Sequence, residues 1–214
     1  GSNMAHTMEA AVAELDNGGD VADSLALGAV RGARGNSGMV LSQVLRGVAE
    51  STVDSVIDGE VFARALQQAV ELVDRAIAEP VEGTVITVLK AAAEAADDAE
   101  AQSGATLHSI VSAAIAAAEK ALERTPSQLP ALREAGVVDA GGAGLVILLE
   151  SLLAEIEGST GHTGLPEPEP DTELEVVFFF EGDIDTLQVA IEPLGDSLVT
   201  VSYTHLTLPT NREV

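Results

Sequence analysis

The chain has 214 residues, of which 46% are hydrophobic and only 2% aromatic, and it contains no cysteine. Its formal net charge is -25, from 10 Lys plus Arg against 35 Asp plus Glu. Such a charge argues against nucleic acid and anionic membranes as partners, and the lack of cysteine excludes disulfides and cysteine-ligated metals. No apolar run reaches the roughly 20 residues of a membrane span, and residues 1–8 lack the features of a signal peptide, so we expect a cytoplasmic protein.

Alanine-rich amphipathic segments fill the first three quarters of the chain. Residues 61–78 give the clearest pattern, because apolar residues recur at i, i+3 and i+4 and Pro80 ends the segment. Similar patterns predict helices at about 4–15, 20–31, 38–50, 84–98, 106–123, 127–135 and 143–157, with Pro126 and Pro130 bracketing the piece at 127–135. Short connections favour antiparallel packing, and the low aromatic content favours close helices, so the predicted fold class is mainly α.

The composition changes at Gly158. Residues 158–172 (GSTGHTGLPEPEPDT) lack periodicity and carry proline at every second position from 166 to 170, which is typical of a stiff, extended linker. Residues 173–201 predict a strand, a short helix and a second strand, which is the start of a middle α/β domain and too small to bury a core alone. Residues 202–214 fit neither pattern and look like translated vector or adaptor sequence, with an ordinary native tail as the alternative.

Three glycine-rich segments each stand at the start of a predicted helix. They are Gly35-Asn36-Ser37-Gly38, Glu82-Gly83-Thr84 and Asp139-Ala140-Gly141-Gly142-Ala143-Gly144. A helix start exposes unpaired N–H groups and the positive end of the helix dipole, and glycine lets the backbone approach a ligand closely. Each segment alone is readily explained as the glycine that ends the preceding helix. The three together, with Arg31 and Arg34 before the first, favour phosphate binding through backbone amides.

These segments resemble the motifs of a known family. Residues 31–47 (RGARGNSGMVLSQVLRG), 80–88 (PVEGTVITV) and 134–144 (EAGVVDAGGAG) are similar, in the same order, to segments of the L-type (DhaL) domain of dihydroxyacetone kinases, in the version carried by the fatty acid kinase A subunit. The resemblance covers residues 1–157. The sequences ELEVVFFF and LGDSLVTV, within 173–201, also resemble the beginning of the middle domain of fatty acid kinase A.

The resemblance implies a barrel of eight antiparallel helices that binds ATP and Mg²⁺ at one end. The γ-phosphoryl group would pass to a fatty acid held by a separate DegV-type protein, giving an acyl phosphate, and a homodimer would form through the middle domain. Ser42 and Gln43 would serve helix packing. The nucleotide-binding residues carried over by motif would be Asn3, His6, Gly35, Asn36, Ser37, Gly38, Gly83, Thr84, Asp139, Gly141 and Gly142.

One departure from the family concerns the metal. The family carries its Mg²⁺ ligands on aspartates of a D-G-D-T-G-[ST]-N-M segment, whereas this chain begins Gly1-Ser2-Asn3-Met4 and holds only the end of it. The alternative is that Gly1-Ser2 is a cloning remnant. On either interpretation the metal ligands and the first helix of the barrel would lie upstream of residue 1. We therefore assign no metal-binding or catalytic residue, and we expect this chain alone to be almost inactive although its parent is an ATP-dependent kinase.

Two other functions stay open at this point. One is a dihydroxyacetone kinase L-type subunit, whose acceptor is a small keto sugar on a partner protein; the strands predicted after the linker argue against it. The other is a helical interaction module that binds nucleotide weakly or not at all, which the missing aspartates favour. No pair of histidines has metal-ligand spacing, and no Ser, His and Asp set suggests a hydrolase.

Overall fold

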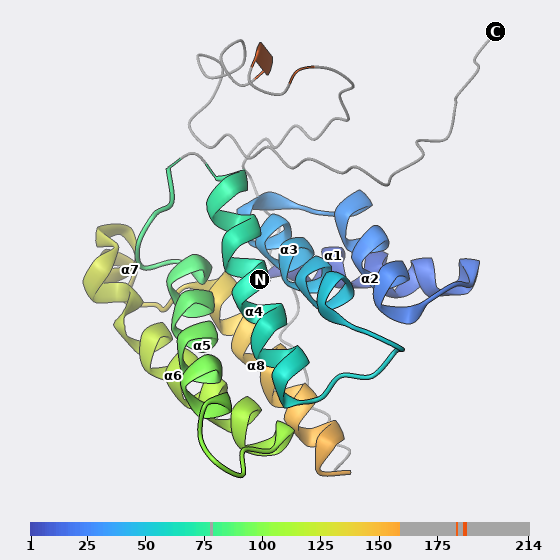
Figure 1. Cartoon of the computed structure of the whole chain (residues 1–214). Helices are drawn as coiled ribbons and strands as arrows, with labels where there is room; N and C mark the ends of the chain where they lie inside the picture. Colours follow the sequence, from blue (N-terminus) through green and yellow to red (C-terminus); the bar gives the residue numbers. More distant parts are fainter. Residues whose placement is uncertain (78, 159–182, 184–185, 188–214) are drawn as a thin grey trace, which may run out of the picture.

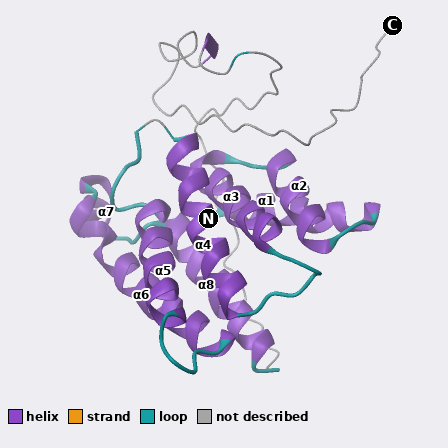
Figure 2. Cartoon of the chain, viewed as in Figure 1, coloured by secondary structure: helices purple, strands orange, loops and turns teal. Residues whose placement is uncertain are grey.

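The structure is a computed structural model of the chain, and it describes residues 1–77, 79–158, 183 and 186–187 (Figure 1). Beyond residue 158, the predicted linker, strands and tail lie outside the described residues, apart from those last three positions. The described part consists of helices joined by loops, without strands (Figure 2). The predicted mainly α fold class is therefore confirmed. None of the described helices is long and apolar enough to cross a membrane.

Eight α-helices and one turn of 3-10 helix follow one another in the described chain. They are α1 (Ser2–Glu14), η1 (Leu15–Asn17), α2 (Val21–Arg31), α3 (Gly35–Ser51), α4 (Gly59–Ala76), α5 (Val85–Glu100), α6 (Leu107–Gln128), α7 (Pro130–Ala135) and α8 (Ala140–Ile156). Side-chain oxygens cap the starts of five helices, from Asp20, Asp58, Thr84, Thr106 and Asp139. That the first helix of an eight-helix barrel lies upstream of residue 1 stays a prediction.

The largest difference from the predicted helices concerns Pro126. The sequence predicts that α6 ends before this proline and that a separate helix spans 127–135, yet α6 continues past it and α7 spans only Pro130–Ala135. Proline lacks the N–H that would bond the carbonyl four residues earlier, which belongs to Leu122. In the structure the Thr125 hydroxyl donates to that carbonyl oxygen at 2.7 Å. The helix tolerates its proline because the carbonyl still has a partner.

Two glycine-rich segments are helical rather than loops that precede a helix. The sequence predicts starts at residues 38 and 143, whereas α3 begins at Gly35 and α8 at Ala140. Glycine is a poor helix former, which is why its presence delays the predicted start. In the structure the first turns of α3 and α8 pack against α1 and against each other, and this packing outweighs the low propensity.

The core is centred on α5, which packs against α4, α6 and α8. Val88, Leu89 and Ala92 of α5 are fully buried there. Small residues bring the helices close together: a Cβ atom added to Gly47 of α3 would lie 2.5 Å from the carbonyl oxygen of Ala65 in α4. Close approach of backbones allows aliphatic side chains to fill the core with very few aromatic residues.

Consecutive helices run up and down, so their starts alternate between two ends of the bundle. The starts of α1, α3, α5 and α8 lie together at one end, which we call the glycine end. The α3–α4 and α5–α6 connections lie at the opposite end, where Nε2 of His108 at the start of α6 is 2.9 Å from a carboxylate oxygen of Glu157 just after α8. Figure 1 shows the α5–α6 connection and the end of α8 together in the lower part of the view.

Candidate functional site

The start of α3 is pressed against the first turns of α1. Gly35 has φ +58, a backbone conformation that residues other than glycine rarely adopt. A Cβ atom there would also lie 2.3 Å from Nδ2 of Asn3. One turn further, a Cβ atom on Gly38 would lie 2.4 Å from the hydroxyl oxygen of Thr7. Both glycines are therefore required by the close approach of α1, and this contact places Asn3 beside the predicted phosphate-binding turn.

The start of α8 lies against the start of α3. A Cβ atom on Gly141 would stand 2.6 Å from Oγ of Ser37, so these two segments, about a hundred residues apart in the chain, meet through a side-chain hydroxyl. Asp139 caps α8, because its Oδ2 accepts the N–H of Gly142 at 2.6 Å. The nitrogen of Gly1 lies 3.1 Å from the carbonyl oxygen of Ala140, which brings the start of α1 to the same place.

The start of α5 completes the glycine end. Gly83 has φ +82 and packs against Gln128 and Leu129, at the junction of α6 and α7. Thr84 caps α5: its hydroxyl oxygen accepts the N–H of Ile86 at 3.4 Å. The same hydroxyl donates to the carbonyl oxygen of Val81 at 2.8 Å. One turn into α5, Val88 touches the first turn of α8 at Gly142.

Several backbone N–H groups at the glycine end are available to a ligand. Within the described residues, the N–H groups of Asn36, Ser37 and Ala140 donate to no acceptor, as expected in the first turn of a helix. Asn36 and Ala140 are exposed. The positive ends of the α3 and α8 dipoles point to the same place. The arrangement can bind an anion, and phosphate oxygens are typical acceptors for such amides.

The nearby side-chain charges are mixed. Arg34 is exposed, and no acidic side chain of the described part of the chain pairs with it, whereas Arg31 is 3.1 Å from a carboxylate oxygen of Glu14. Glu82 and Asp139 bring negative charge to the same end, and each accepts a hydrogen bond there. Binding of an anion would therefore depend mainly on backbone amides, with Arg34 as a cation close to the α3 turn.

The predicted site residues fall into three groups in the structure. Asn3, Gly35, Ser37, Gly38, Asp139, Gly141 and Gly142 form one continuous set of contacts, with Asn36 on its exposed side. Gly83 and Thr84 lie at the same end and join this set through Val88. His6 is exposed on α1, and its side chain makes no hydrogen bond or ion pair with the other described residues. The role of all these residues in binding stays a prediction.

Three threonines at the glycine end were not predicted from the sequence. Each accepts a hydrogen bond from a backbone N–H at the start of a helix. For Thr7 and Thr125 this is another helix, and for Thr87 it is the helix to which Thr87 itself belongs. Nothing in the local sequence distinguishes them from other helical threonines. Thr7 and Thr125 act on segments from other parts of the chain, so only the packing of the helices identifies them.

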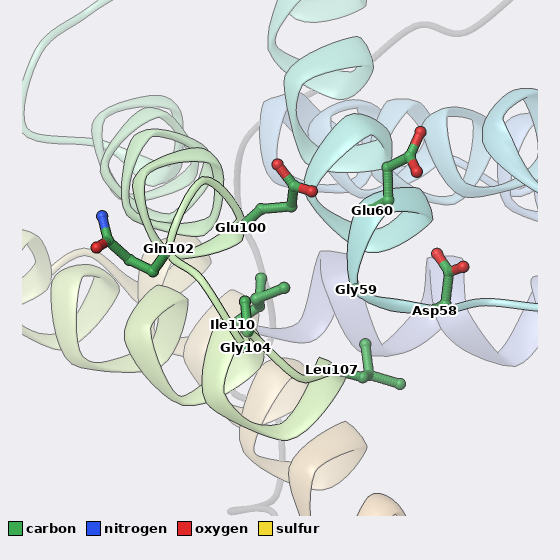
Figure 3. Close-up of a pocket in the computed structure, with 9 residues that line it drawn as sticks. Asp58, Gly59, Glu60, Glu100, Gln102, Gly104, Leu107 and Ile110 are labelled. Carbon is green, nitrogen blue, oxygen red and sulfur yellow. The ribbon is translucent and has the colours of Figure 1, made fainter.

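The hollow in Figure 3 lies at the opposite end of the bundle, between the starts of α4 and α6 and the end of α5. It has a volume of about 420 Å³ and presents the carboxylates of Asp58, Glu60 and Glu100. Three carboxylates repel a phosphate, so this hollow does not fit the anion predicted for the glycine end. No group of three or more His, Cys, Asp or Glu residues in the described part of the chain could hold a metal ion.

The comparisons with known proteins agree with the sequence motifs. The model of the DAK2 domain family matches residues 1–154. The chain is 40% identical over 166 residues to Protein YloV of Bacillus subtilis (strain 168), which covers 75% of this chain and 30% of that protein. It is 34% identical over 192 residues to an uncharacterized protein of Staphylococcus aureus (strain USA300), covering 87% of this chain and 35% of that protein. The chain thus spans about a third of the length of these relatives.

Proposed function

This chain belongs to the DAK2 domain family, and we propose that its glycine end binds ATP for transfer of the γ-phosphoryl group to a fatty acid held by a partner protein. The family membership supports the coarser part of this statement, a kinase-related nucleotide-binding domain of the dihydroxyacetone kinase family. The identity of the nucleotide, the metal and the acceptor belongs to the proposal.

The contact between Ser37 and Gly141 carries the proposal. It brings two glycine-rich helix starts together, so that free N–H groups from α3 and α8 lie at one place on the surface. The β- and γ-phosphates of a nucleotide carry several acceptor oxygens at short spacing, which suits two adjacent amide sources better than one. This arrangement also explains how so acidic a chain can bind a polyanion with few cations.

The two implied ligands fit the described residues differently. A phosphate chain fits, because the amides of Asn36, Ser37 and Ala140 are free within the described residues and two of them are exposed. Mg²⁺ does not fit these residues, since they contain no suitable group of three ligands and Asp139 is engaged as a helix cap. The proposal that Mg²⁺ is a cofactor of the kinase therefore rests on the family resemblance alone, and none of the described residues is proposed as its ligand.

The acceptor rests on sequence resemblance. The segments at 31–47 and 173–201 resemble fatty acid kinase A, and we propose a DegV-type fatty-acid-binding protein as the partner. A dihydroxyacetone-binding subunit is the competing partner. Titration of this chain with each partner, the first loaded with a fatty acid and the second with dihydroxyacetone, separates the two: binding of the dihydroxyacetone-binding subunit alone would overturn the fatty acid proposal.

Nucleotide binding is tested by calorimetric titration of ATP into the 214-residue chain, with and without excess Mg²⁺, and with AMP as the control for phosphate recognition. We expect ATP to bind more tightly than AMP. Amide NMR spectra locate the site: signals of Asn36, Ser37 and Gly141 should shift on addition of ATP, while those of Gly104, at the opposite end, should not. Absence of binding both in this chain and in a chain extended by the upstream aspartate segment, or shifts confined to the opposite end, would rule out the glycine end as the nucleotide site and favour an interaction module.

A further inference from the structure

Three threonine hydroxyls at the glycine end share one hydrogen-bonding arrangement. Oγ1 of Thr7 accepts the backbone N–H of Arg34 at 3.1 Å, Oγ1 of Thr87 accepts that of Gly83 at 2.9 Å, and Oγ1 of Thr125 accepts that of Asp139 at 3.0 Å. Arg34 and Asp139 are the residues immediately before α3 and α8, and Gly83 immediately precedes Thr84, the cap of α5. Each of the three predicted phosphate-binding segments thus has its own threonine at the point where the helix begins.

The hydroxyl protons of these threonines are already used. The Thr7 hydroxyl donates to the carbonyl oxygen of Asn3 at 2.8 Å, and the Thr87 hydroxyl donates to Oε2 of Glu82 at 2.8 Å. The Thr125 hydroxyl donates to the carbonyl oxygen of Leu122 at 2.7 Å. With its proton directed elsewhere, each hydroxyl presents a lone pair to the turn, and the turn N–H is therefore fixed in direction.

Thr7 and Thr125 have no exposed surface at all. Water cannot take the place of either hydroxyl without a rearrangement, so the N–H groups of Arg34 and Asp139 depend on these two oxygens. Both threonines also come from other helices: Thr7 lies on α1 and Thr125 on α6, while the turns open α3 and α8. The two bonds tie the position of each turn to the packing of the whole bundle.

We propose that Thr7 and Thr125, with Thr87 in a more exposed version of the same arrangement, are positioning residues that hold the helix starts in the geometry needed for phosphate binding. This inference rests on the proposed function, because it concerns the same site. The threonines do not contact the ligand. Thr7 and Thr125 fix the residue immediately before the first helical turn, and Thr87 fixes Gly83, just before the cap of α5. Each hydroxyl thus sets the direction of the amides of that turn.

Replacing threonine with valine tests the role of the hydroxyl, because the two side chains have nearly the same shape. In Thr7→Val or Thr125→Val the turn N–H loses its buried acceptor, and the turn relaxes towards positions in which water can reach that group. Binding must then restore the original geometry, which lowers the apparent affinity. We expect affinity for ATP to fall about tenfold in each variant.

Thr52→Val is the matched control. Thr52 is half-buried at the C-terminal end of α3, away from the glycine end, and its hydroxyl donates to the carbonyl oxygen of Val48 at 2.7 Å. It should leave ATP affinity unchanged. Thr7→Ser and Thr125→Ser keep the hydroxyl and lose only a methyl group, so they should restore most of the affinity. Equal losses in the serine and valine variants would overturn the proposal, since packing would then explain them, and so would an equal loss in Thr52→Val.

Amide hydrogen exchange in the ligand-free protein supplies a readout that does not need a nucleotide. The N–H of Arg34 should exchange faster in Thr7→Val only, and that of Asp139 faster in Thr125→Val only. If neither the unaltered chain nor a chain extended by the upstream aspartate segment binds ATP, the proposed function fails, and exchange alone then decides whether the threonines hold the turns. Unchanged exchange at both positions, or unchanged ATP affinity in a chain that binds ATP, would overturn the positioning role.

Discussion

Ser37 in the first turn of α3 lies so close to Gly141 in the first turn of α8 that a Cβ atom on the glycine would stand 2.6 Å from the serine hydroxyl oxygen. Real Cβ atoms do not approach an oxygen to that distance, so any side chain at residue 141 would force Ser37 to move, and glycine lets the two helix starts pack this closely. The contact fixes the separation of two sets of free amides, and it therefore links the packing of the bundle to the proposed phosphate site.

Gly141→Ala should separate these two helix starts. The added methyl group must displace Ser37 or its helix, and overpacking of this kind costs about 1–3 kcal/mol of unfolding free energy. Urea unfolding measures that cost, and titration with ATP should show a clear loss of affinity. Gly144→Ala is the matched control on the same helix, because its new Cβ would meet mainly the flexible thioether of Met4, at 2.7 Å. Equal ATP affinity in the two variants would contradict the prediction.

Asp139→Ala should weaken both α8 and nucleotide binding. The variant removes the cap that accepts the N–H of Gly142, which lowers the unfolding free energy by about 1 kcal/mol. Without this hydrogen bond the first turn of α8 can move from its present position. Asp58→Ala removes an equivalent cap, which accepts the N–H of Val61 at 2.9 Å, from the start of α4 at the opposite end. Both variants should lose similar stability in urea unfolding, but only Asp139→Ala should bind ATP less tightly. The prediction fails if the Asp58 variant has the same binding defect.

The stability contributed by Asp20 should depend on pH in the acid range. Hydrogen bonds from the Ser55 hydroxyl and from the backbone N–H groups of Asp23 and Ala22 lower the pKa of Asp20 below its ordinary value of 3.8. A lowered folded-state pKa stabilises the protein above the unfolded-state value, and this contribution is lost as the pH falls through the folded-state pKa. The difference in unfolding free energy between the parent chain and Asp20→Asn should therefore be constant at neutral pH and shrink below about pH 4.

Ser55→Ala provides the control for this titration. It removes the largest cause of the lowered pKa and leaves the cap of α2 in place. The change in stability between pH 5 and pH 2 should be smaller in Ser55→Ala than in the parent chain. An Asp20→Asn variant whose stability difference from the parent does not vary with pH would show that the carboxylate charge is irrelevant to folding.

Gly47→Ala should destabilise the fold without affecting the glycine end directly. A Cβ atom at this position would lie 2.5 Å from the carbonyl oxygen of Ala65, and a backbone atom cannot move aside as a flexible side chain can. We expect α3 and α4 to separate, at a cost of about 3 kcal/mol or more in thermal or urea unfolding. A loss below about 0.5 kcal/mol would mean that the helices adjust easily and that their close packing contributes little.

The sequence determined the elements of this protein because they depend on local interactions. The apolar periodicity of α4 and the proline that follows it, Pro80, act within a few positions of themselves, so the helices could be predicted with their order and approximate bounds. The glycine-rich segments could be recognised as helix starts for the same reason. Local reasoning failed at Pro126, where the Thr125 hydroxyl supplies the missing partner of a carbonyl group.

Only the tertiary structure decided which helix starts meet. The contact of Ser37 with Gly141 joins segments about a hundred residues apart, and no short-range pattern in the sequence encodes such a distance. The same holds for Thr7 and Thr125, whose hydroxyls act on turns from other parts of the chain. A hydrogen bond or a steric contact needs two groups within a few ångströms in space, whatever their separation along the sequence. The assembled site therefore follows from the packing of the helices.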